Sequence, residues 1–297
     1  MTEVTEVRSF SIKEDGFFGI LFKNEKVLCP NKALVVSTGS DGDLDYLRGL
    51  SKNLCATGIT VLGLGFYKVP DSPNTICEVP LEYAENAAKY LKSNGYEKIG
   101  FYSASMGSVY ALLSVSYFPE LFSFVAISAA LNYVYEAVSP DGRRLIKGKS
   151  SFSYRGKPIP FEPCVKKMSM RNFIIDSIKR GDMSNAYLYE SLVTTAKEEH
   201  FIPVEKMRAH VLLFSGKMDL YWPSELSGNM IIKRLKEHNY PYPCEHVVFE
   251  RGGHLITPVE VKGSMPKFFK ATRKYPKENE EYCKKTIEKI VEYFKAF

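Results

Sequence analysis

Short apolar runs alternate with longer amphipathic segments along most of the chain, and this alternation limits the folds open to it. Six runs have the apolar character of strands buried on both faces of a parallel sheet; they cover 33–37, 59–64, 98–102, 122–127, 210–214 and 246–249. Helical patterns lie between or after them, near 43–57, 80–94, 106–118, 224–238 and 276–296. The alternation predicts an α/β fold, in which a mostly parallel sheet carries helices on both faces.

Two parts of the chain break this rhythm. Near the N-terminus, the segments 11–13 and 19–22 flank Glu14-Asp15-Gly16, which predicts a hairpin on an edge of the sheet. From about Leu131 to Met207 no core strand is visible, and the interval is too long for a plain loop. We therefore expect one α/β domain over residues 1–297, with residues 131–207 inserted in it as a helical cap.

The composition is that of an ordinary soluble globular protein, because 45% of the 297 residues are hydrophobic and 25% are charged. No run approaches the roughly 18 apolar residues that cross a bilayer. Residues 1–6 also lack the basic and apolar regions of a secretory signal peptide. These features predict a cytoplasmic protein without stable membrane insertion.

The cysteines and histidines show no metal or redox pattern. None of the six cysteines stands in a CxxC pair, and the five histidines include no HExxH motif. We therefore predict no metal ion and no other cofactor. The net charge of +6 is unevenly placed, because residues 141–180 hold 11 basic side chains against three acidic ones, a local +8. These cations either pair with an anionic part of a substrate or simply solvate the cap.

The segment Ser103-Ala104-Ser105-Met106-Gly107 has the pattern of a nucleophile elbow, because it follows a predicted strand and opens a predicted helix. Such a turn needs small residues two positions before and after the nucleophile. Ser103 and Gly107 are both small, although Ser103 stands where the usual motif has glycine. The turn would present Ser105 Oγ beside a helix N-terminus, which favours developing negative charge. The alternative is a chance serine in a strand-to-helix turn.

Two later residues complete a candidate triad in the chain order serine, acid, histidine. Asp219 follows the predicted strand at 210–214, and His254 follows the strand at 246–249 after a glycine pair. Open parallel sheets place their sites past the carboxyl ends of their strands. We therefore predict that His254 takes the Ser105 proton and that Asp219 fixes the imidazole tautomer. The remaining histidines are expected to be structural or solvated: His200, His210, His238 and His246, with His210 and His246 opening strands.

Backbone N–H groups near Ser105 would stabilise the oxyanion of an acyl-transfer intermediate. Met106 is predicted to supply one of them. The second should come from the loop 37–43 after the first core strand, with Ser40 as the first choice and Gly39 as the fallback. A phosphate-binding loop is excluded there, because neither G-x-G-x-x-G nor Gly-Lys-Ser/Thr occurs.

The substrate pocket is expected between the cap and the triad. Tyr221 and Trp222 follow Asp219 directly and are predicted to border this pocket as substrate-binding residues. Four aromatic residues of the cap are either further pocket liners or, as is more usual, core residues: Phe152, Tyr154, Phe161 and Phe173.

Further short segments run in order from about residue 30 to the C-terminus. They are Thr38-Gly39 with Leu44-Asp45-Tyr46, Leu64-Gly65-Phe66-Tyr67, Leu81-Glu82-Tyr83, the Ser105 elbow, residues 153–160, Phe201-Ile202-Pro203-Val204-Glu205, Asp219 with Trp222-Pro223-Ser224, and Gly253-His254-Leu255-Ile256-Thr257-Pro258. In these segments the sequence resembles the C-terminal catalytic domain of the acyl-CoA thioesterase and bile acid-CoA:amino acid N-acyltransferase family.

The resemblance implies an α/β-hydrolase fold and maps the family's triad onto Ser105, Asp219 and His254. A serine nucleophile is similar to the thioesterase branch, whereas the conjugating branch uses cysteine, so the resemblance favours hydrolysis over transfer to an amine. Only about 30 residues precede the resembling region, so the β-sandwich domain of the animal enzymes is not expected here.

We therefore expect a serine hydrolase that cleaves a small-molecule thioester, acyl-CoA first among them, through an acyl-enzyme. A carboxylesterase or another acyl hydrolase or acyltransferase would use the same triad, and an inactive binding protein on the same fold is a third possibility. Nucleic-acid binding is not expected, because no recognised module is present. The acyl chain, the leaving group and the oligomeric state stay open.

Overall fold

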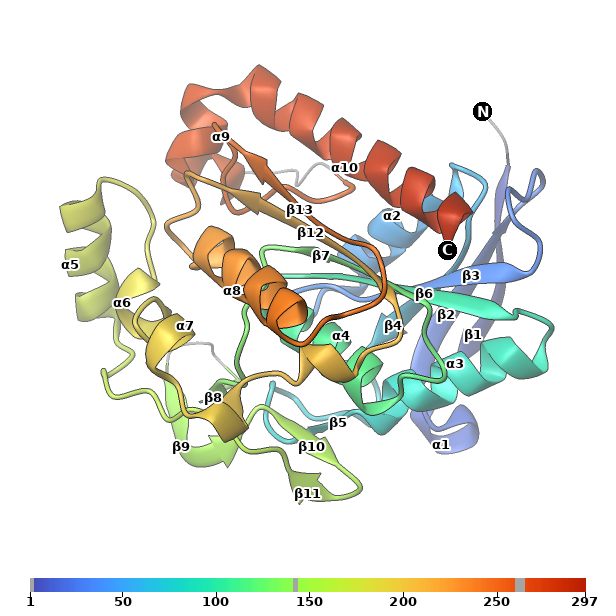
Figure 1. Ribbon diagram of the computed structural model, residues 1–297, viewed down its shortest axis with the longest axis horizontal. Helices are drawn as coiled ribbons and strands as arrows, with labels where there is room; N and C mark the ends of the chain where they lie inside the picture. The colour runs from blue at the N-terminus through green and yellow to red at the C-terminus, as the bar shows by residue number, and fades with distance from the viewer. Residues whose placement is uncertain (1–2, 141–143, 260–264) are drawn as a thin grey trace.

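An eight-stranded sheet forms the centre of the computed structural model, which describes residues 3–140, 144–259 and 265–297 (Figure 1). The strand order is β1-β2-β4-β3-β6-β7-β12-β13. All strands from β4 to β13 run parallel, and β2 is antiparallel to both of its neighbours. The strands are β1 (Val4–Phe10), β2 (Phe18–Asn24), β3 (Lys32–Val36), β4 (Thr60–Gly65), β6 (Lys98–Ala104), β7 (Phe124–Ser128), β12 (His210–Gly216) and β13 (Cys244–Phe249).

The central strands are buried on both faces, as their apolar sequences predict. Every residue of β3, β4 and β7 is buried. Because side chains alternate along a strand, Ala33 and Val35 enter the core on one face of the sheet, while Leu34 and Val36 enter the core on the other. The predicted α/β fold with a mostly parallel sheet is confirmed.

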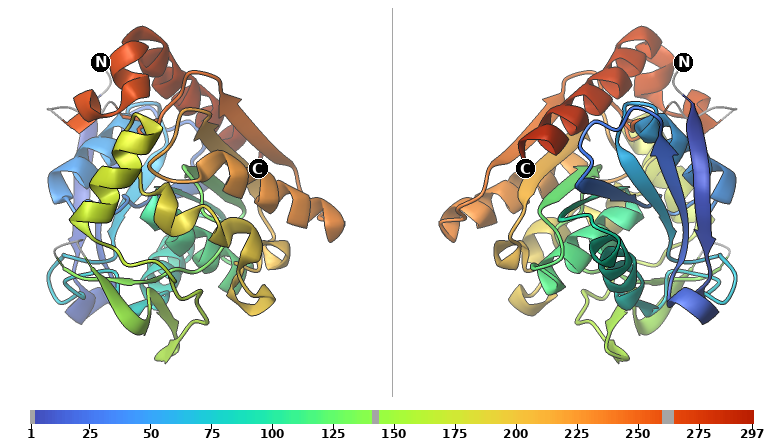
Figure 2. Two further views of the ribbon diagram at one scale, coloured as in Figure 1. Left: turned by 90° about the vertical axis from the view of Figure 1, so that its left-hand side faces the viewer. Right: turned by 90° about the vertical axis from the view of Figure 1, so that its right-hand side faces the viewer.

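Helices cover both faces of the sheet, close to the predicted bounds. On one face lie α2 (Leu44–Cys55) and α10 (Pro276–Ala296), and on the other lie α3 (Glu82–Ser93), α4 (Met106–Tyr117) and α8 (Ser224–Glu237). Figure 2 shows the red α10 and the teal α3 on opposite sides of the sheet. In the part of the chain that the structure describes, no helix has both the length and the apolarity needed to cross a membrane.

The N-terminal hairpin lies at the sheet edge as predicted, but its bounds differ from the prediction. The two strands are β1 and β2, and residues expected as the first strand instead form α1 (Ile12–Asp15). Ser11 Oγ caps this turn by accepting a hydrogen bond from Glu14 N–H, and Gly16 closes it with φ of +77°. Capping residues at both ends thus form a helical turn where the residue pattern predicted a strand.

The interval 131–207 carries the predicted helices and also short strands that the sequence pattern did not predict. The helical elements are α5 (Met170–Arg180), α6 (Ala186–Tyr189), α7 (Leu192–Thr195), η1 (Glu198–His200) and η2 (Val204–Lys206). The strands are β8 (Glu136–Val138), β9 (Leu145–Ser150), β10 (Phe152–Tyr154) and β11 (Lys157–Pro158). β10 pairs in parallel with the distant β5 (Val79–Pro80), so its partner lies far away in the sequence.

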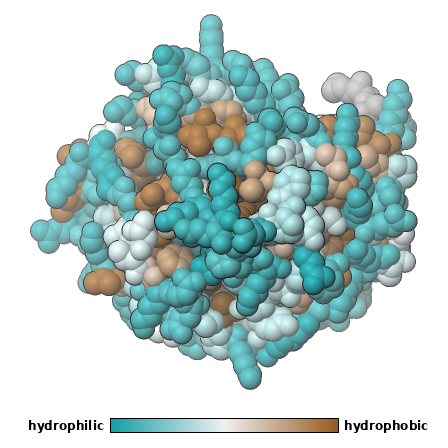
Figure 3. Space-filling model, viewed as in Figure 1, coloured by the Kyte–Doolittle hydropathy of each residue, from teal (hydrophilic) through white to brown (hydrophobic). Residues whose placement is uncertain are grey.

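The outermost helix of this interval exposes apolar side chains. α5 has no buried residue, and Met170, Ile174 and Ile178 are 58%, 48% and 75% exposed. Figure 3 shows a mainly hydrophilic face with brown patches at its left edge, where Figure 1 places α5. Two further short elements, η3 (Met265–Phe268) and α9 (Lys270–Lys274), precede α10.

Candidate active site

Ser105 stands alone between β6 and α4 in a backbone conformation that few non-glycine residues adopt. Its φ and ψ are +53° and −128°, as expected for a nucleophile on a sharp strand-to-helix turn. A Cβ at Gly107 would collide with the Thr38 carbonyl oxygen and lie 2.5 Å from Ser103 Oγ, so glycine is required there. Serine at position 103 is tolerated because its Oγ is held by Ser37 Oγ at 2.8 Å.

His254 and Asp219 extend from Ser105 in one chain of hydrogen bonds. Ser105 Oγ lies 3.0 Å from His254 Nε2, and His254 Nδ1 lies 3.1 and 3.0 Å from the two Asp219 carboxylate oxygens. The side chains of His254 and Asp219 are only 7% and 1% exposed. The three residues come from loops after β6, β13 and β12, which meet at the carboxyl edge of the sheet. The structure therefore brings the predicted triad together.

The Asp219 carboxylate is fixed by its own loop. Oδ1 accepts hydrogen bonds from the N–H groups of Tyr221 and Trp222 at 3.2 and 3.0 Å, and Oδ2 accepts one from Ser224 Oγ at 2.7 Å. These bonds hold the carboxylate in place beside His254. An ionised Asp219 can hold a proton on His254 Nδ1, which leaves Nε2 free to accept the proton of Ser105.

Backbone N–H groups next to Ser105 differ in whether they already donate a hydrogen bond. Among the described residues, neither Met106 N–H nor Ser40 N–H has a hydrogen-bond acceptor, whereas Gly39 N–H donates to Asp41 Oδ2 at 3.1 Å. A Cβ on Gly39 would lie 3.1 Å from Ser105 Cβ, so this loop packs directly against the serine. The geometry favours Ser40 over Gly39 as the partner of Met106 in an oxyanion hole, and both assignments stay predictions.

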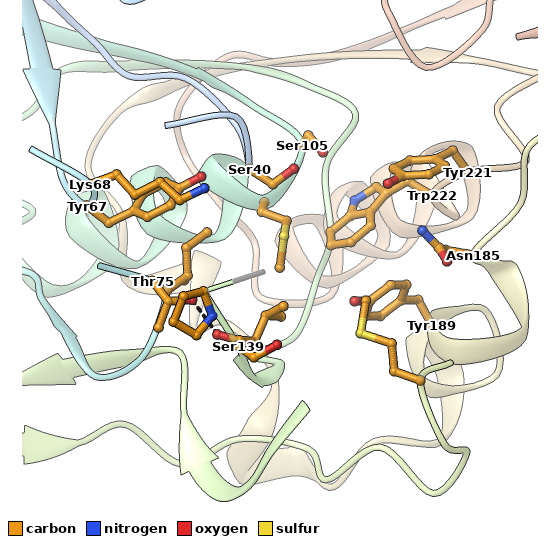
Figure 4. Close-up of a pocket in the computed structure, with 15 residues that line it drawn as sticks. Ser40, Tyr67, Lys68, Thr75, Ser105, Ser139, Asn185, Tyr189, Tyr221 and Trp222 are labelled. Atoms are coloured by element: carbon orange, nitrogen blue, oxygen red, sulfur yellow. Dashed lines mark hydrogen bonds between the residues drawn. The ribbon is translucent and has the colours of Figure 1, made fainter. Parts of the chain in front are cut away.

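A cavity of about 220 Å³ opens beside Ser105 (Figure 4). The predicted Tyr221 and Trp222 line it. The sequence did not predict the other ten lining residues, which are Tyr67, Lys68, Thr75, Ile76, Val138, Ser139, Pro140, Met168, Asn185 and Tyr189. Six of these ten belong to the interval 131–207, which therefore contributes much of the cavity wall. The available signal for Tyr67 was the segment Leu64-Gly65-Phe66-Tyr67, which carries part of the family resemblance.

The aromatic residues proposed as alternative pocket liners do not line this cavity. Phe152 is fully buried against Tyr110 and Tyr135, and Tyr154 packs on Tyr117. Phe161 packs against the same core. For these three, packing is the role that the structure shows.

The other histidines lie away from Ser105. His200 Nδ1 is 2.7 Å from Glu162, and His210 is the first residue of β12. His246 was expected to open a strand but is the third residue of β13, where its Nε2 lies 2.7 Å from Ser215 Oγ. Burial lowers the pKa of His246 to about 4, so this imidazole is neutral near pH 7.

Four of the ten described basic side chains of residues 141–180 are held in ion pairs. Arg155 forms a bidentate pair with Glu85 at 2.6 and 2.7 Å, and Lys147 and Lys149 pair with glutamates at 3.1 and 3.0 Å. None of the described cations of this stretch lines the cavity. Residues 141–143 lie outside the described residues. Among those described, no cluster of three potential ligands for a metal ion is present.

Two solved structures that share this fold carry the names of a hydrolase and an esterase. A putative dienelactone hydrolase from Klebsiella pneumoniae aligns over 99% of this chain and 100% of its own, with a TM-score of 0.60 at 13% identity. A carboxyl esterase from Tuber melanosporum covers 99% and 88%, with a TM-score of 0.55 at 15% identity. Together with the sheet order and the elbow, these likenesses define an α/β-hydrolase fold.

Residues 79–274 match the family model described as "BAAT / Acyl-CoA thioester hydrolase C terminal", and the chain belongs to this family. Rat acyl-coenzyme A thioesterase 1 is 28% identical over 220 residues, which are 73% of this chain and 46% of the relative. Human acyl-coenzyme A thioesterase 1 is 26% identical over 233 residues, 77% and 50% of the two chains. The chain thus spans about half the length of the curated relatives that it matches.

Proposed function

We propose that this protein is a serine hydrolase of thioesters, with an acyl-CoA as substrate and Ser105 as nucleophile. One observation carries the proposal: Ser105, His254 and Asp219 are joined by hydrogen bonds at a strained elbow that faces a cavity. Membership of the family and the names of the relatives support a thioester substrate.

In the acylation half of the reaction, Ser105 Oγ attacks the thioester carbonyl carbon while His254 Nε2 accepts its proton. Asp219 stabilises the imidazolium that forms. The negative charge on the carbonyl oxygen would be met by the N–H groups of Met106 and Ser40. Collapse of the tetrahedral intermediate breaks the carbon–sulfur bond. His254 returns the proton to the leaving sulfur, which departs as the free thiol and leaves an acyl-Ser105 ester.

In the deacylation half, a water molecule takes the place of the thiol. His254 Nε2 accepts a proton from this water as its oxygen attacks the ester carbonyl. The bond to Ser105 Oγ then breaks and His254 protonates that oxygen, so the free acid leaves and the enzyme is restored. Each half uses the same two N–H donors and the same imidazole.

The test is to incubate the whole protein with acyl-CoAs of graded chain length and to follow free thiol. We expect turnover with at least one acyl-CoA and none above background for Ser105→Ala. Hydrolysis of simple aryl esters without turnover of any acyl-CoA would overturn the thioesterase proposal.

That second result would favour a carboxylesterase on the same triad. The small cavity supports this alternative, because about 220 Å³ lies below the roughly 300–1,000 Å³ of typical ligand pockets. A panel of aryl esters and acyl-CoAs with matched acyl groups separates the two activities. Labelling of Ser105 by a fluorophosphonate probe, absent in Ser105→Ala, tests the nucleophile in either case.

A further inference from the structure

The outer side of α5 carries apolar and basic side chains only. Of the 11 residues of this helix six are exposed, namely Met170, Arg171, Ile174, Ile175, Ile178 and Lys179. A surface helix normally turns its apolar residues towards the core and its polar residues towards water. α5 therefore presents to the outside the side chains that other helices bury, and an exposed apolar patch of this kind marks an interaction surface.

Polar contacts with the rest of the protein hold α5 in this orientation. Asp176, the one acidic residue of the helix, accepts hydrogen bonds from Ser184 Oγ at 2.5 Å and from Arg180 Nε at 3.4 Å. Ser177 Oγ accepts a hydrogen bond from Ser184 N–H at 3.1 Å, and Arg180 also donates to Glu190 at 2.5 Å. These bonds fix the rotation of α5 about its axis, so the apolar side stays outermost.

The cations on this side have no acidic partner within the described part of the chain. Arg171 and Lys179 are exposed and form no ion pair there, in contrast to Arg180 on the inner side. At about 100° per residue, Arg171 lies between Ile178 and Ile175 around the helix. Positive charge is thus interleaved with the apolar side chains. Lys166 and Lys167, which are also exposed, extend it before the helix begins.

α5 also protrudes from the molecule. Figure 1 places it at the outer edge, and the left view of Figure 2 shows it as a single helix in front of the other elements. The element α9 adjoins its C-terminal end, because Lys270 N–H donates to Asp182 Oδ1 at 2.8 Å. Just before α9, Lys267 is exposed and Phe268 is 60% exposed. The mixture of apolar and basic side chains therefore continues next to α5.

An anionic lipid surface fits this face better than a second copy of the chain does. A two-fold contact between two α5 helices would bring Arg171 and Lys179 of both copies together, and like charges repel. Lipid phosphates attract those cations, while the aliphatic side chains enter the boundary of the acyl chains. With 11 residues, α5 is about 17 Å long and cannot span a core of about 30 Å, so it would lie in the plane of the surface.

We propose that α5 docks reversibly on an anionic phospholipid bilayer, with Ile174 and Ile178 in the acyl-chain boundary and Arg171 and Lys179 at the phosphates. Met168 and Asn185, which precede and follow the helix, line the cavity beside Ser105, so the docked face is next to the candidate active site. The proposal does not rest on the function proposed above, because binding to lipid does not require the triad.

The first measurement is flotation of the whole protein with phospholipid vesicles. Vesicles of phosphatidylcholine are compared with vesicles that also contain about 30% phosphatidylserine, and we expect at least about tenfold stronger partitioning onto the anionic ones. Raising NaCl to about 0.5 M should weaken this binding, because salt screens the attraction. Absence of binding to the anionic vesicles, or equal binding to both kinds, would overturn the proposal.

Two paired substitutions separate the apolar part of the surface from the rest of the protein. Ile174→Gln with Ile178→Gln should weaken partitioning at least about tenfold. The unfolding midpoint in urea should not fall, because both side chains are about half or more exposed. Val7→Gln with Leu226→Gln is the matched control, since these residues are 50% and 39% exposed on β1 and α8, and it should bind like the wild type. Undiminished binding of the α5 pair would show attraction by charge alone and overturn the docking of α5.

The cations are tested in the same way. Arg171→Gln with Lys179→Gln should weaken binding to the phosphatidylserine vesicles by about 25-fold, at about fivefold for each cation. Lys26→Gln with Lys236→Gln removes two exposed lysines on other elements and should weaken it by less than about threefold. Equal losses in the two pairs would indicate general attraction of a basic protein, and docking through α5 would then be wrong.

A fluorescence measurement locates the helix in the bilayer without removing any contact. Ile178→Trp adds an indole at a position that is 75% exposed, whereas the single native tryptophan, Trp222, is 2% exposed. Vesicles with brominated acyl chains should quench the fluorescence of Ile178→Trp and leave that of the wild type unchanged. Vesicle-bound Ile178→Trp without quenching would contradict insertion of the apolar side.

Light scattering in solution tests the second copy as the occupant. We expect the wild type and the Ile174→Gln/Ile178→Gln variant to have the same mass. A wild-type dimer that this pair of substitutions dissociates would assign the face to self-association and overturn the lipid proposal.

Discussion

Two hydrogen-bonded serine–histidine pairs occur among the described residues, and they differ in their surroundings. In the first, Ser105 Oγ lies 3.0 Å from His254 Nε2, and Asp219 holds the far side of the ring. In the second, Ser215 Oγ lies 2.7 Å from His246 Nε2, and Asn229 Oδ1 lies 3.1 Å from His246 Nδ1. By side-chain contacts alone, the second pair has the arrangement of a serine–histidine–amide triad.

The surroundings separate the two pairs. Ser105 is on a strained turn with φ of +53° and lines a cavity, whereas Ser215 lies within β12, is 2% exposed and lines no described cavity. Asp219 can stabilise an imidazolium, but the neutral amide of Asn229 cannot do so to the same extent. A Cβ on Gly228 would lie 2.5 Å from the His246 ring, which shows how closely α8 packs on it.

A serine–histidine contact does not by itself indicate a nucleophile. What favours Ser105 is the combination of a position in the cavity wall, a carboxylate behind the imidazole and two N–H groups without acceptors among the described residues. The second pair joins β12, β13 and α8, which is a structural role.

The largest effect is expected from removing one serine and not the other. Ser105→Ala should lower kcat by at least about 10⁴-fold in a protein that stays folded, because it deletes the nucleophile. Ser215→Ala should keep kcat/KM within about twofold while losing roughly 1 kcal/mol of stability through its broken hydrogen bond. Steady-state kinetics and urea unfolding measure both. Loss of activity in a stably folded Ser215→Ala variant would contradict the comparison.

A second prediction concerns the group behind each imidazole. Asp219→Asn should lower kcat by about 10³-fold, because an amide neither fixes the productive tautomer nor stabilises the imidazolium. The reverse change, Asn229→Asp, gives the second pair a carboxylate but no access to substrate. Fluorophosphonate labelling of Asn229→Asp in the Ser105→Ala background should therefore remain absent, and labelling at Ser215 would show that a carboxylate is sufficient.

A third prediction tests the backbone of the elbow. Gly107→Ala places a methyl group against the Thr38 carbonyl oxygen, which cannot rotate away as a side chain can. We expect a loss of about 2–4 kcal/mol in stability and at least 10²-fold lower activity. Gly49→Ala is the matched control, since a Cβ there has no neighbour within 4 Å and α2 should gain about 0.5–1 kcal/mol. Equal effects of the two changes would argue against a constrained elbow.

The smallest effect should come from titrating the second pair. Burial lowers the pKa of His246 to about 4 from its ordinary 6.5, so folding favours the neutral ring. The stability that this adds is fully present above pH 6.5 and is lost as the pH falls from 6.5 towards 4, by about 1–3 kcal/mol. Urea midpoints across this range should fall less steeply in His246→Gln. His238→Gln, at the exposed end of α8, should follow the wild type.

The elements that could be predicted from the sequence are those whose signals are local. The apolar runs of β3, β4 and β7 fix their burial, and the small residues around Ser105 fix the elbow, because each depends on neighbours within a few positions. The hairpin bounds were wrong where caps at Ser11 and Gly16 outweighed alternation. The short strands of the interval 131–207 were missed because their partners, such as β5, are distant in the sequence.

The candidate site also has parts that could be predicted from the sequence and parts that could not. The chain order of Ser105, Asp219 and His254 and the ends of their strands predicted which residues meet, since parallel strands bring their carboxyl ends to one edge. The bond between His246 and Ser215, the buried Tyr67 Oη and Trp222 Nε1 that lack partners among the described residues, and the wall of the cavity could not be predicted. They depend on how loops from distant parts of the chain close over the sheet.

By itself, then, the sequence determined the parallel sheet, the strained turn and the three residues at its edge, because periodicity and residue size act over short distances. The three-dimensional packing was needed to show which of the two serine–histidine pairs faces a cavity, and which N–H groups and buried polar atoms lack a partner among the described residues. Those properties depend on contacts between segments far apart in the chain. Packing excludes water there, so a polar group without a partner is destabilising.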